Sequence, residues 1–205
     1  MENLKLTSFI KRANKFMIFN LILSVLIGVI FFIIGMSIND FSDYPNLNLN
    51  NKVDNSLNGL IEIFCNNAFI MPLTSLIIAL IPIPYLYLIP SISTIFSLSM
   101  AIGIQFAYKF NEGTVLLIGI LPHGLLEIYI MSVLLSLLFA LNKYIRNSLV
   151  NLFKKNKTYL PKFLNVITSI CKCYLLVMLP LTFICVLIEV FITPNWYQFL
   201  KNILI

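Results

Sequence analysis

The sequence predicts an all-α, polytopic membrane protein with about five transmembrane helices, its N-terminus cytoplasmic and its C-terminus outside. Composition and hydropathy point to this class. Hydrophobic residues make up 60% of the 205 residues and charged residues only 11%, and the mean hydropathy is +0.95. Soluble domains carry about 25% charged residues. This chain therefore has too few polar side chains to coat a surface in water, and a bilayer is its expected environment.

The apolar residues form five runs, which we take as the candidate spans of a single integral membrane domain over residues 1–205. A helix needs about 20 residues to cross the hydrocarbon. The runs cover residues 16–38, 68–89, 91–108, 114–141 and 173–192. The first run is longer than the core of a signal peptide, and the NDFSDYPN that follows lacks a small-residue cleavage site. We therefore expect the first run to be retained as a span.

The charges between the runs orient the chain. Basic residues cluster before the first run and in the linker 142–162, whereas the loop 39–67 carries four acidic residues against Lys52. Cytoplasmic flanks are enriched in Lys and Arg, so we expect the linker and the amino terminus inside and the loop outside. Three runs lie between that loop and the linker. An odd number of crossings takes the chain from the outside to the inside, so the number of runs agrees with the expected sides.

The same distribution bears on location and partners. The net charge is +6, but the basic residues flank apolar runs instead of forming one nucleic-acid-binding face. This is the pattern of a multi-pass protein of a cytoplasmic membrane, where anionic lipid attracts basic flanks. We expect the lipid bilayer as a partner and do not expect nucleic acid.

The segment IPIPYLYLIP interrupts the second run with Pro82, Pro84 and Pro90. A proline cannot donate a backbone hydrogen bond, and irregular backbone is not tolerated where it faces lipid. We therefore favour a turn at the inner surface between the second and third spans, where Tyr85 suits the interface. A re-entrant hairpin over residues 68–108 is the alternative.

Small residues recur at helical spacing in two runs. They are Ser24, Gly28 and Gly35 in the first run, and Ser99, Gly103 and Ala107 in the third. Small residues at this spacing let helix backbones approach closely in a bilayer. We expect these faces to pack against other helices.

The carboxyl-terminal residues NWYQFLKNILI form a short amphipathic run. Trp196, Tyr197 and Lys201 are residue types that anchor a helix at the boundary between membrane and water. We expect an interfacial helix on the outer leaflet.

Two ionisable residues lie inside the fourth run, in the stretch GILPHGLLEIY. Glu127 is near the middle of the run, and His123 lies four residues earlier on the same helix face. Pro122 frees a carbonyl one turn earlier, and Gly124 allows another backbone or a ligand to approach. An ionised carboxylate in the bilayer is costly. A polar clamp between helices is the favoured interpretation, with a proton or ion relay and part of a metal site as alternatives.

Neither a metal site nor an active site is expected. His123 is the only histidine, so an HxxxE pair supplies two ligands at most, and the Cys171/Cys173 pair has no second cluster to complete a tetrahedral set. The runs show no nucleophile–base arrangement. We therefore expect no catalytic residues, no cofactor, no metal and no enzymatic activity.

Three motifs together resemble the stage II sporulation protein M family. LPHGLLEI stands in the fourth run, VLIEVFITPNW ends the fifth, and IFCNNAF begins the second. The resemblance covers most of the chain from about residue 60 to residue 196. By the resemblance, the outer end of the fifth span and the start of the second also carry family motifs. Their residues are Glu189, Thr193 and Pro194 in the former, and Asn66 and Asn67 in the latter.

The resemblance implies a non-enzymatic scaffold or assembly component of a bacterial cell-envelope complex. The sporulation member is a membrane scaffold that associates with cell-wall hydrolases, and other envelope proteins and a homo-oligomer are compatible with that role. Some members accompany circular bacteriocins, so the alternative is a transporter-like component for maturation, export or self-protection of such a peptide. The chain departs from the family at residues 88–93, LIPSIS, where an asparagine–glycine pair is frequent. No role is carried over to that turn.

Overall fold

The computed structural model describes residues 5–38, 57–154 and 159–204, and every regular element in these ranges is a helix. The α-helices are α1 (Leu6–Met36), α2 (Leu57–Cys65), α3 (Met71–Leu80), α4 (Ile89–Tyr108), α5 (Phe110–Phe153), α6 (Phe163–Cys173), α7 (Leu179–Leu187) and α8 (Thr193–Leu204). Three π-helical segments are η1 (Asn66–Ile70), η3 (Tyr174–Met178) and η4 (Ile188–Ile192), and a 3-10 turn is η2 (Leu86–Leu88). The π-helical segments join α2 to α3, α6 to α7 and α7 to α8.

Five helical stretches within the described ranges are long and apolar enough to cross a membrane. They are Leu6–Met36, Leu57–Leu80, Leu86–Tyr108, Phe110–Phe153 and Phe163–Leu204. This confirms the predicted all-α class with five candidate spans.

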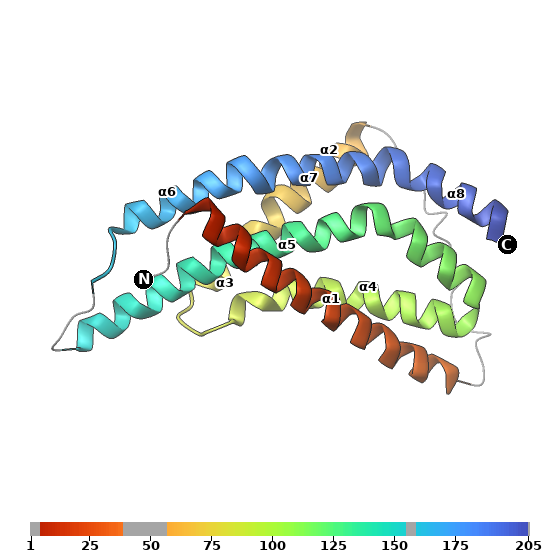
Figure 1. The fold of residues 1–205 in the computed structure, drawn as a ribbon, viewed down its shortest axis with the longest axis horizontal. Helices are drawn as coiled ribbons and strands as arrows, with labels where there is room; N and C mark the ends of the chain where they lie inside the picture. The colour runs from red at the N-terminus through yellow and green to blue at the C-terminus, as the bar shows by residue number, and fades with distance from the viewer. Residues whose placement is uncertain (1–4, 39–56, 155–158, 205) are drawn as a thin grey trace.

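Helix α5 is the central element of the bundle. Helices α1 and α4 lie along one side of it, and the long rod of α6, α7 and α8 lies along the other (Figure 1). Residues 130–138 of α5 are buried on every face. Apolar composition alone does not put α5 at the centre, because α1 is more apolar and remains mostly exposed. Helix α5 is enclosed because α1, α4 and the stretch from α6 to α8 all pack against it.

Helices α1 and α4 pack through the small residues predicted for this purpose. A Cβ atom added to Gly103 would collide with the carbonyl oxygen of Gly28, so the two backbones touch. The hydroxyl groups of Ser24 and Ser99 form a hydrogen bond of 2.8 Å across the same contact. Because the two backbones lie in contact, α1 and α4 gain dispersion contacts with each other, and such packing stabilises helix association in a bilayer.

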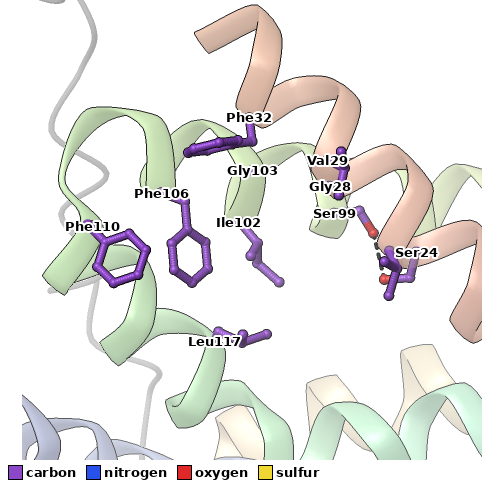
Figure 2. Close-up of a pocket in the computed structure, with 11 residues that line it drawn as sticks. Ser24, Gly28, Val29, Phe32, Ser99, Ile102, Gly103, Phe106, Phe110 and Leu117 are labelled. Carbon is purple, nitrogen blue, oxygen red and sulfur yellow. Dashed lines mark hydrogen bonds between the residues drawn. The ribbon is translucent and has the colours of Figure 1, made fainter. Parts of the chain in front are cut away.

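An apolar groove opens beside this contact, where α1, α4 and the start of α5 diverge. It holds about 360 Å³ and is lined by the rings of Phe32, Phe106 and Phe110 and by Leu117, with the Ser24–Ser99 pair at its far end (Figure 2). Its lining is almost wholly apolar. A groove of this composition suits lipid chains or apolar side chains and offers no catalytic group.

Polar side chains attach α1 to α5 deep in the bundle. Asn20 Nδ2 donates to Ser132 Oγ at 3.1 Å, Arg12 donates to the Ser136 carbonyl at 3.0 Å, and Ser136 Oγ donates to the Phe9 carbonyl at 2.8 Å. Hydrogen bonds between helices in a bilayer are worth about 1 kcal/mol each. They fix the rotation of α1, whose surface is otherwise uniformly apolar.

The prolines of IPIPYLYLIP end α3 earlier than the predicted span 68–89. Helix α3 stops at Leu80, because Pro82 and Pro84 have no amide hydrogen with which to continue it. A turn follows, as the favoured interpretation has it, and Tyr85 adopts the left-handed conformation there with φ 65°. The chain resumes as η2 and α4.

Asn142 of α5 organises the carbonyls that this proline turn leaves open. Its Nδ2 donates to the carbonyls of Ala79 at 3.0 Å, Ile81 at 2.8 Å and Ile83 at 3.3 Å. Its Oδ1 accepts from Arg146 Nε at 3.0 Å. Asn142 is buried, and its amide satisfies three carbonyls of the turn, where the helix that would have supplied their donors has ended.

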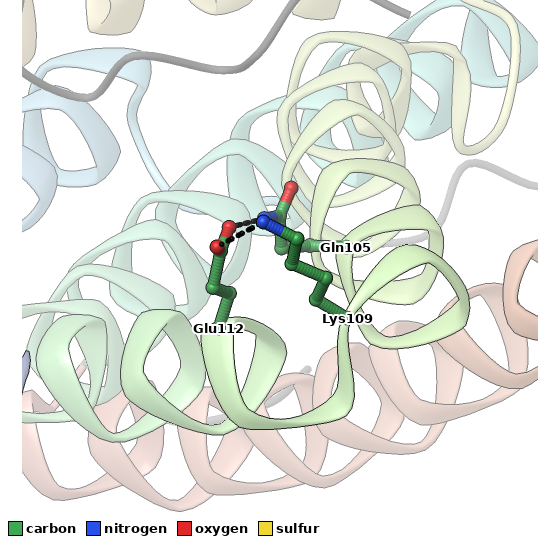
Figure 3. A network of polar contacts seen from close by, with 3 residues as sticks. All are labelled: Gln105, Lys109 and Glu112. Carbon is green, nitrogen blue, oxygen red and sulfur yellow. Dashed lines mark hydrogen bonds and ion pairs between the residues drawn. The ribbon is translucent and has the colours of Figure 1, made fainter. Parts of the chain in front are cut away.

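A polar network closes the turn between α4 and α5 at the other end of the bundle. Glu112 accepts a hydrogen bond from Gln105 Nε2 at 2.9 Å and forms an ion pair of 2.9 Å with Lys109 Nζ (Figure 3). The hydrogen bond and charge of Glu112 raise the pKa of the Lys109 amine above its ordinary value. The pair joins the residue before α5 to the first turn of that helix.

Several predicted boundaries differ from the structure. Helix α2 begins at Leu57, inside the predicted outer loop 39–67, of which residues 39–56 lie outside the described residues. Helix α5 continues through NKYIRNSLVNLF to Phe153, which shortens the predicted linker 142–162, because that polar stretch contains no helix breaker. The fifth span was predicted over 173–192, but its helical stretch covers Phe163–Leu204.

The predicted interfacial helix is also different. Helix α8 continues the fifth helical stretch and packs against the start of α5 instead of forming a separate surface helix (Figure 1). The side chains predicted to anchor it at the interface, Trp196 and Tyr197, contact α5.

Candidate functional site

The proline of the motif in α5 determines the first contact of the site. Pro122 lies inside α5 and has no amide hydrogen, so the carbonyl of Ile118 loses its regular helical donor. Trp196 of α8 supplies a replacement, since its Nε1–H donates to the Ile118 carbonyl at 3.2 Å. Beside it, a Cβ atom at Gly119 would lie 3.0 Å from the Tyr197 ring. Pro122 lacks an amide hydrogen, which leaves the Ile118 carbonyl free to accept from Trp196. Gly119 lacks a side chain, which leaves space for the Tyr197 ring, so α8 packs against α5 here.

His123 bonds to the fifth span one turn further along. Its Nδ1 lies 2.9 Å from Thr193 Oγ1, and Thr193 Oγ1 donates to the Ile188 carbonyl at 3.1 Å. Because the hydroxyl hydrogen is directed at Ile188, the lone pair of Thr193 faces His123, and Nδ1 is the donor of a neutral imidazole. The two predicted motifs, in the fourth and fifth spans, therefore meet through this pair.

Cys185 and Gly124 complete the contact between α5 and α7. Cys185 Sγ donates to the carbonyl of His123 at 3.4 Å, and its side chain is buried. A Cβ atom at Gly124 would meet Ile120 of the same helix at 2.9 Å. Gly124 was expected to admit another helix, but its closest neighbour lies within α5, and Gly119 is the glycine that another helix approaches.

Glu127 faces a small cavity instead of a hydrogen-bonding side chain. The cavity holds about 10 Å³, room for about one water molecule, and its polar lining comes from Asn67, Glu127, Thr182 and Cys185. Within the described ranges no side chain donates a hydrogen bond to the Glu127 carboxylate. Glu189 of η4 lies close enough for the two carboxyl groups to interact electrostatically. The expected clamp is thus formed by His123, and Glu127 lies beside it.

The asparagines at the start of the second span reach the same place. Asn67 lies in η1 and lines the cavity of Glu127, and its Oδ1 accepts a hydrogen bond of 3.2 Å from Asn66 Nδ2. All three predicted groups are therefore brought to one region of the bundle, formed by the second, fourth and fifth spans. Asn66 itself is exposed and faces away from the cavity lining.

The three π-helical segments share a sequence feature. Each is followed, after one intervening residue, by a proline: Pro72 after η1, Pro180 after η3 and Pro194 after η4. In a regular helix a residue at position 72 would donate to the carbonyl of Ala68, and the Tyr174 hydroxyl donates to that carbonyl instead. π-Helical segments are frequent at functional sites, and here all three adjoin prolines.

Sequence reasoning did not find the donors of the site. Tyr174 and Trp196 donate to the carbonyls that Pro72 and Pro122 leave open, and Asn142 does so at the proline turn. A usable signal was present, because a proline within a span leaves one carbonyl without its helical donor, and a side chain of another helix is one group that can satisfy it in lipid. That signal identifies the acceptor but not the donor.

A protein-family model, described as Stage II sporulation protein M, matches residues 16–194 of the chain. No curated protein and no solved structure matches the chain. The matched range includes the Pro122–Glu127 motif, Thr193 opposite His123, and the start of the second span, and it ends two residues before Trp196.

Proposed function

The chain belongs to the stage II sporulation protein M family, and on that premise we propose that it is a non-enzymatic membrane scaffold or assembly component of a bacterial cell-envelope complex. Its site would then hold the spans in the one arrangement that presents a binding surface to partners. Cell-wall hydrolases are the expected partners on the outer side.

The observation that supports this proposal is the use of the motif side chains. His123 bonds to Thr193, and the carbonyls freed by Pro122 and Pro72 receive hydrogen bonds from Trp196 and Tyr174. Each contact joins the fifth span to another span of the same chain. Such groups set helix rotation and register, which is the requirement of a scaffold.

The test of this proposal replaces Glu127. In a scaffold, Glu127→Gln should preserve assembly better than Glu127→Leu, because the amide can still donate and accept hydrogen bonds at the cavity that Glu127 shares with Asn67 and Thr182, whereas leucine can do neither. Assembly is measured by native gel electrophoresis of gently solubilised membranes from cells that encode the chain. Equal loss of the complex with both variants would count against the proposal.

A second candidate function rests on the position of Glu127. Its side chain lines a small, mostly apolar cavity and interacts electrostatically with Glu189, and two neighbouring carboxyl groups suit the binding of a proton or cation. The alternative is therefore a transporter-like component for maturation, export or self-protection of a circular bacteriocin. It predicts that Glu127→Gln abolishes activity while assembly survives. Flux into proteoliposomes that does not depend on Glu127 would remove this candidate.

A further inference from the structure

Three segments of the chain meet at the end of the bundle that holds the proline turn. Arg12 of α1 donates to the Ser136 carbonyl of α5 at 3.0 Å. The amide of Asn142 in α5 binds carbonyls of the turn between α3 and α4. The start of α1, the proline turn and the part of α5 around Asn142 are therefore joined by polar contacts.

This end lies at a boundary of the hydrocarbon. Lys15 is the last charged residue before the apolar part of α1, and Lys143 is the first charged residue after Glu127 in α5. Residues 81–85 of the turn are irregular and exposed, and irregular backbone that protein does not cover is not tolerated in the hydrocarbon. Basic residues that flank apolar runs lie at the level of the lipid headgroups. We therefore place this end at that level.

Arg146 is oriented here by a buried amide. Asn142 is buried and anchored on the carbonyls of the turn, and its Oδ1 accepts from Arg146 Nε at 3.0 Å. Within the described ranges the two terminal nitrogens of Arg146 donate to no group. A guanidinium fixed in this way presents a pair of N–H donors that matches two oxygens of a phosphate group.

Tyr87 of η2 supplies a second donor. The residue is only 1% exposed, yet its hydroxyl forms no hydrogen bond to any residue that the structure describes. Tyr87 lies close enough to Arg12 and Arg146 to interact with both electrostatically. A guanidinium has no acceptor to offer a hydroxyl hydrogen. These neighbouring groups thus share the need for an acceptor, and an anionic oxygen would serve all of them.

The ring of Phe139 brings a further positive charge to the same place. It contacts the guanidinium of Arg12 at 4.7 Å and Nζ of Lys143 at 5.6 Å from its centroid. Positive charges gathered in this way create a potential that attracts an anion. Further into the membrane, Phe19 and Ile22 of α1 are exposed. The chains of a lipid would lie beside them if its phosphate were at the basic residues.

We propose that Arg146 and Tyr87, with Arg12 and Lys143 beside them, bind the phosphate of an anionic membrane phospholipid. Basic pockets between membrane helices are suited to such headgroups. A general attraction of basic flanks to anionic lipid needs no fixed geometry, whereas this site has an oriented guanidinium and a buried hydroxyl. The site goes beyond the proposed function and does not depend on it, because neither Glu127 nor an envelope partner takes part.

The experiment measures lipid binding by the purified chain in detergent. Native mass spectrometry follows phosphatidylglycerol, and phosphatidylcholine, which has a phosphate but no net charge, should bind clearly more weakly. Arg146→Lys keeps the charge but loses the paired donors. It should weaken phosphatidylglycerol binding about tenfold, the effect of losing one charge-assisted hydrogen bond. Lys11→Gln, which removes an exposed charge one residue before Arg12, is the control and should leave binding unchanged.

A second variant tests the buried donor. Tyr87→Phe removes only the hydroxyl and should weaken phosphatidylglycerol binding about fivefold. Thermal unfolding without lipid shows that each variant is folded where its binding is measured. Equal affinity for the two lipids would overturn the proposal, as would unchanged binding in both Arg146→Lys and Tyr87→Phe. Inorganic phosphate that displaces phosphatidylglycerol at equal concentration would assign the site to a soluble anion and would overturn it as well.

Discussion

Pro122 shows how a missing hydrogen atom selects a neighbouring helix. In water an open carbonyl would be solvated, but in the hydrocarbon only a protein group can satisfy it. The Ile118 carbonyl therefore needs a donor, and Trp196 provides one from α8. Ala68 receives the hydroxyl of Tyr174 in the same way. Pro122 and Pro72 thus each mark one point of contact with another span.

The first prediction concerns Trp196. Trp196→Phe keeps an aromatic ring against Phe199, with which the indole stacks at 5.8 Å, but removes the donor to Ile118. We expect a loss of about 1–3 kcal/mol, the cost of an unsatisfied buried group, measured by thermal unfolding in detergent micelles. Tyr197→Phe is the control, because within the described residues its hydroxyl forms no hydrogen bond.

A double-mutant cycle with Pro122 isolates the cause. Pro122→Ala restores an amide hydrogen for the Ile118 carbonyl, so Trp196→Phe should cost clearly less in that background. Additive effects of the two substitutions would show that the indole stabilises the protein only by packing.

The second prediction concerns Thr193. Thr193→Ser keeps the hydroxyl that bonds to His123, whereas Thr193→Val has nearly the same shape without it. We expect valine to lower the free energy of unfolding by about 1–2 kcal/mol more than serine does. The measurement is again unfolding in micelles, and a valine variant as stable as the serine variant would contradict a polar clamp.

The sequence identifies polar residues inside the spans better than it identifies their contacts. Pro122, His123 and Glu127 stand out because ionisable and helix-breaking residues are rare in apolar runs. Their partners do not stand out in the sequence. His123 and Thr193 are 70 positions apart, and the rotation of each helix about its axis, which decides the side chains that meet, is set only by packing. Glu127 shows this limit of prediction. It lies on the same side of α5 as His123, but the structure places its side chain at a small cavity and not at a hydrogen-bonding side chain.

Helix ends are harder to predict than helix packing. The close approach of α1 and α4 follows from the glycines and serines of both runs. The end of α5 does not follow from hydropathy, because the polar stretch after Leu141 leaves the hydrocarbon without breaking the helix. Hydropathy indicates whether a segment is surrounded by lipid or by water. A helix, by contrast, ends only at a helix-breaking residue or at a turn that no contact stabilises.

The third prediction tests the contact of α1 with α4. Gly103→Ala places a methyl group against the carbonyl of Gly28, and backbone cannot yield as a flexible side chain does. We expect a destabilisation of about 1–3 kcal/mol, typical of overpacking. Gly28→Ala is the matched control in the same interface, since its Cβ would lie 3.7 Å from the Ser99 carbonyl, an ordinary contact. Equal effects would mean that loss of glycine flexibility, and not the clash, is responsible.

The arrangement of the whole bundle gives its two ends different chemistry. At one end α4 and α5 turn through the Lys109–Glu112 pair, and at the other the end of α5 and the start of α6 carry lysines and exposed apolar side chains. An odd number of spans places the two termini on opposite sides of the membrane. The charge bias of the ends then decides which side is which, since Lys and Arg are retained in the cytoplasm.

The last prediction is this orientation, with the amino terminus inside and the carboxyl terminus outside. Single cysteines at Asn50, Asn111 and Asn156 are labelled with an impermeant maleimide in intact cells and in inside-out vesicles. Positions 50 and 111 should react in intact cells and position 156 only in vesicles, because the basic residues near position 156 resist translocation whereas Asn111 lies in the turn on the opposite side. Reaction of position 156 in intact cells would invert the bundle.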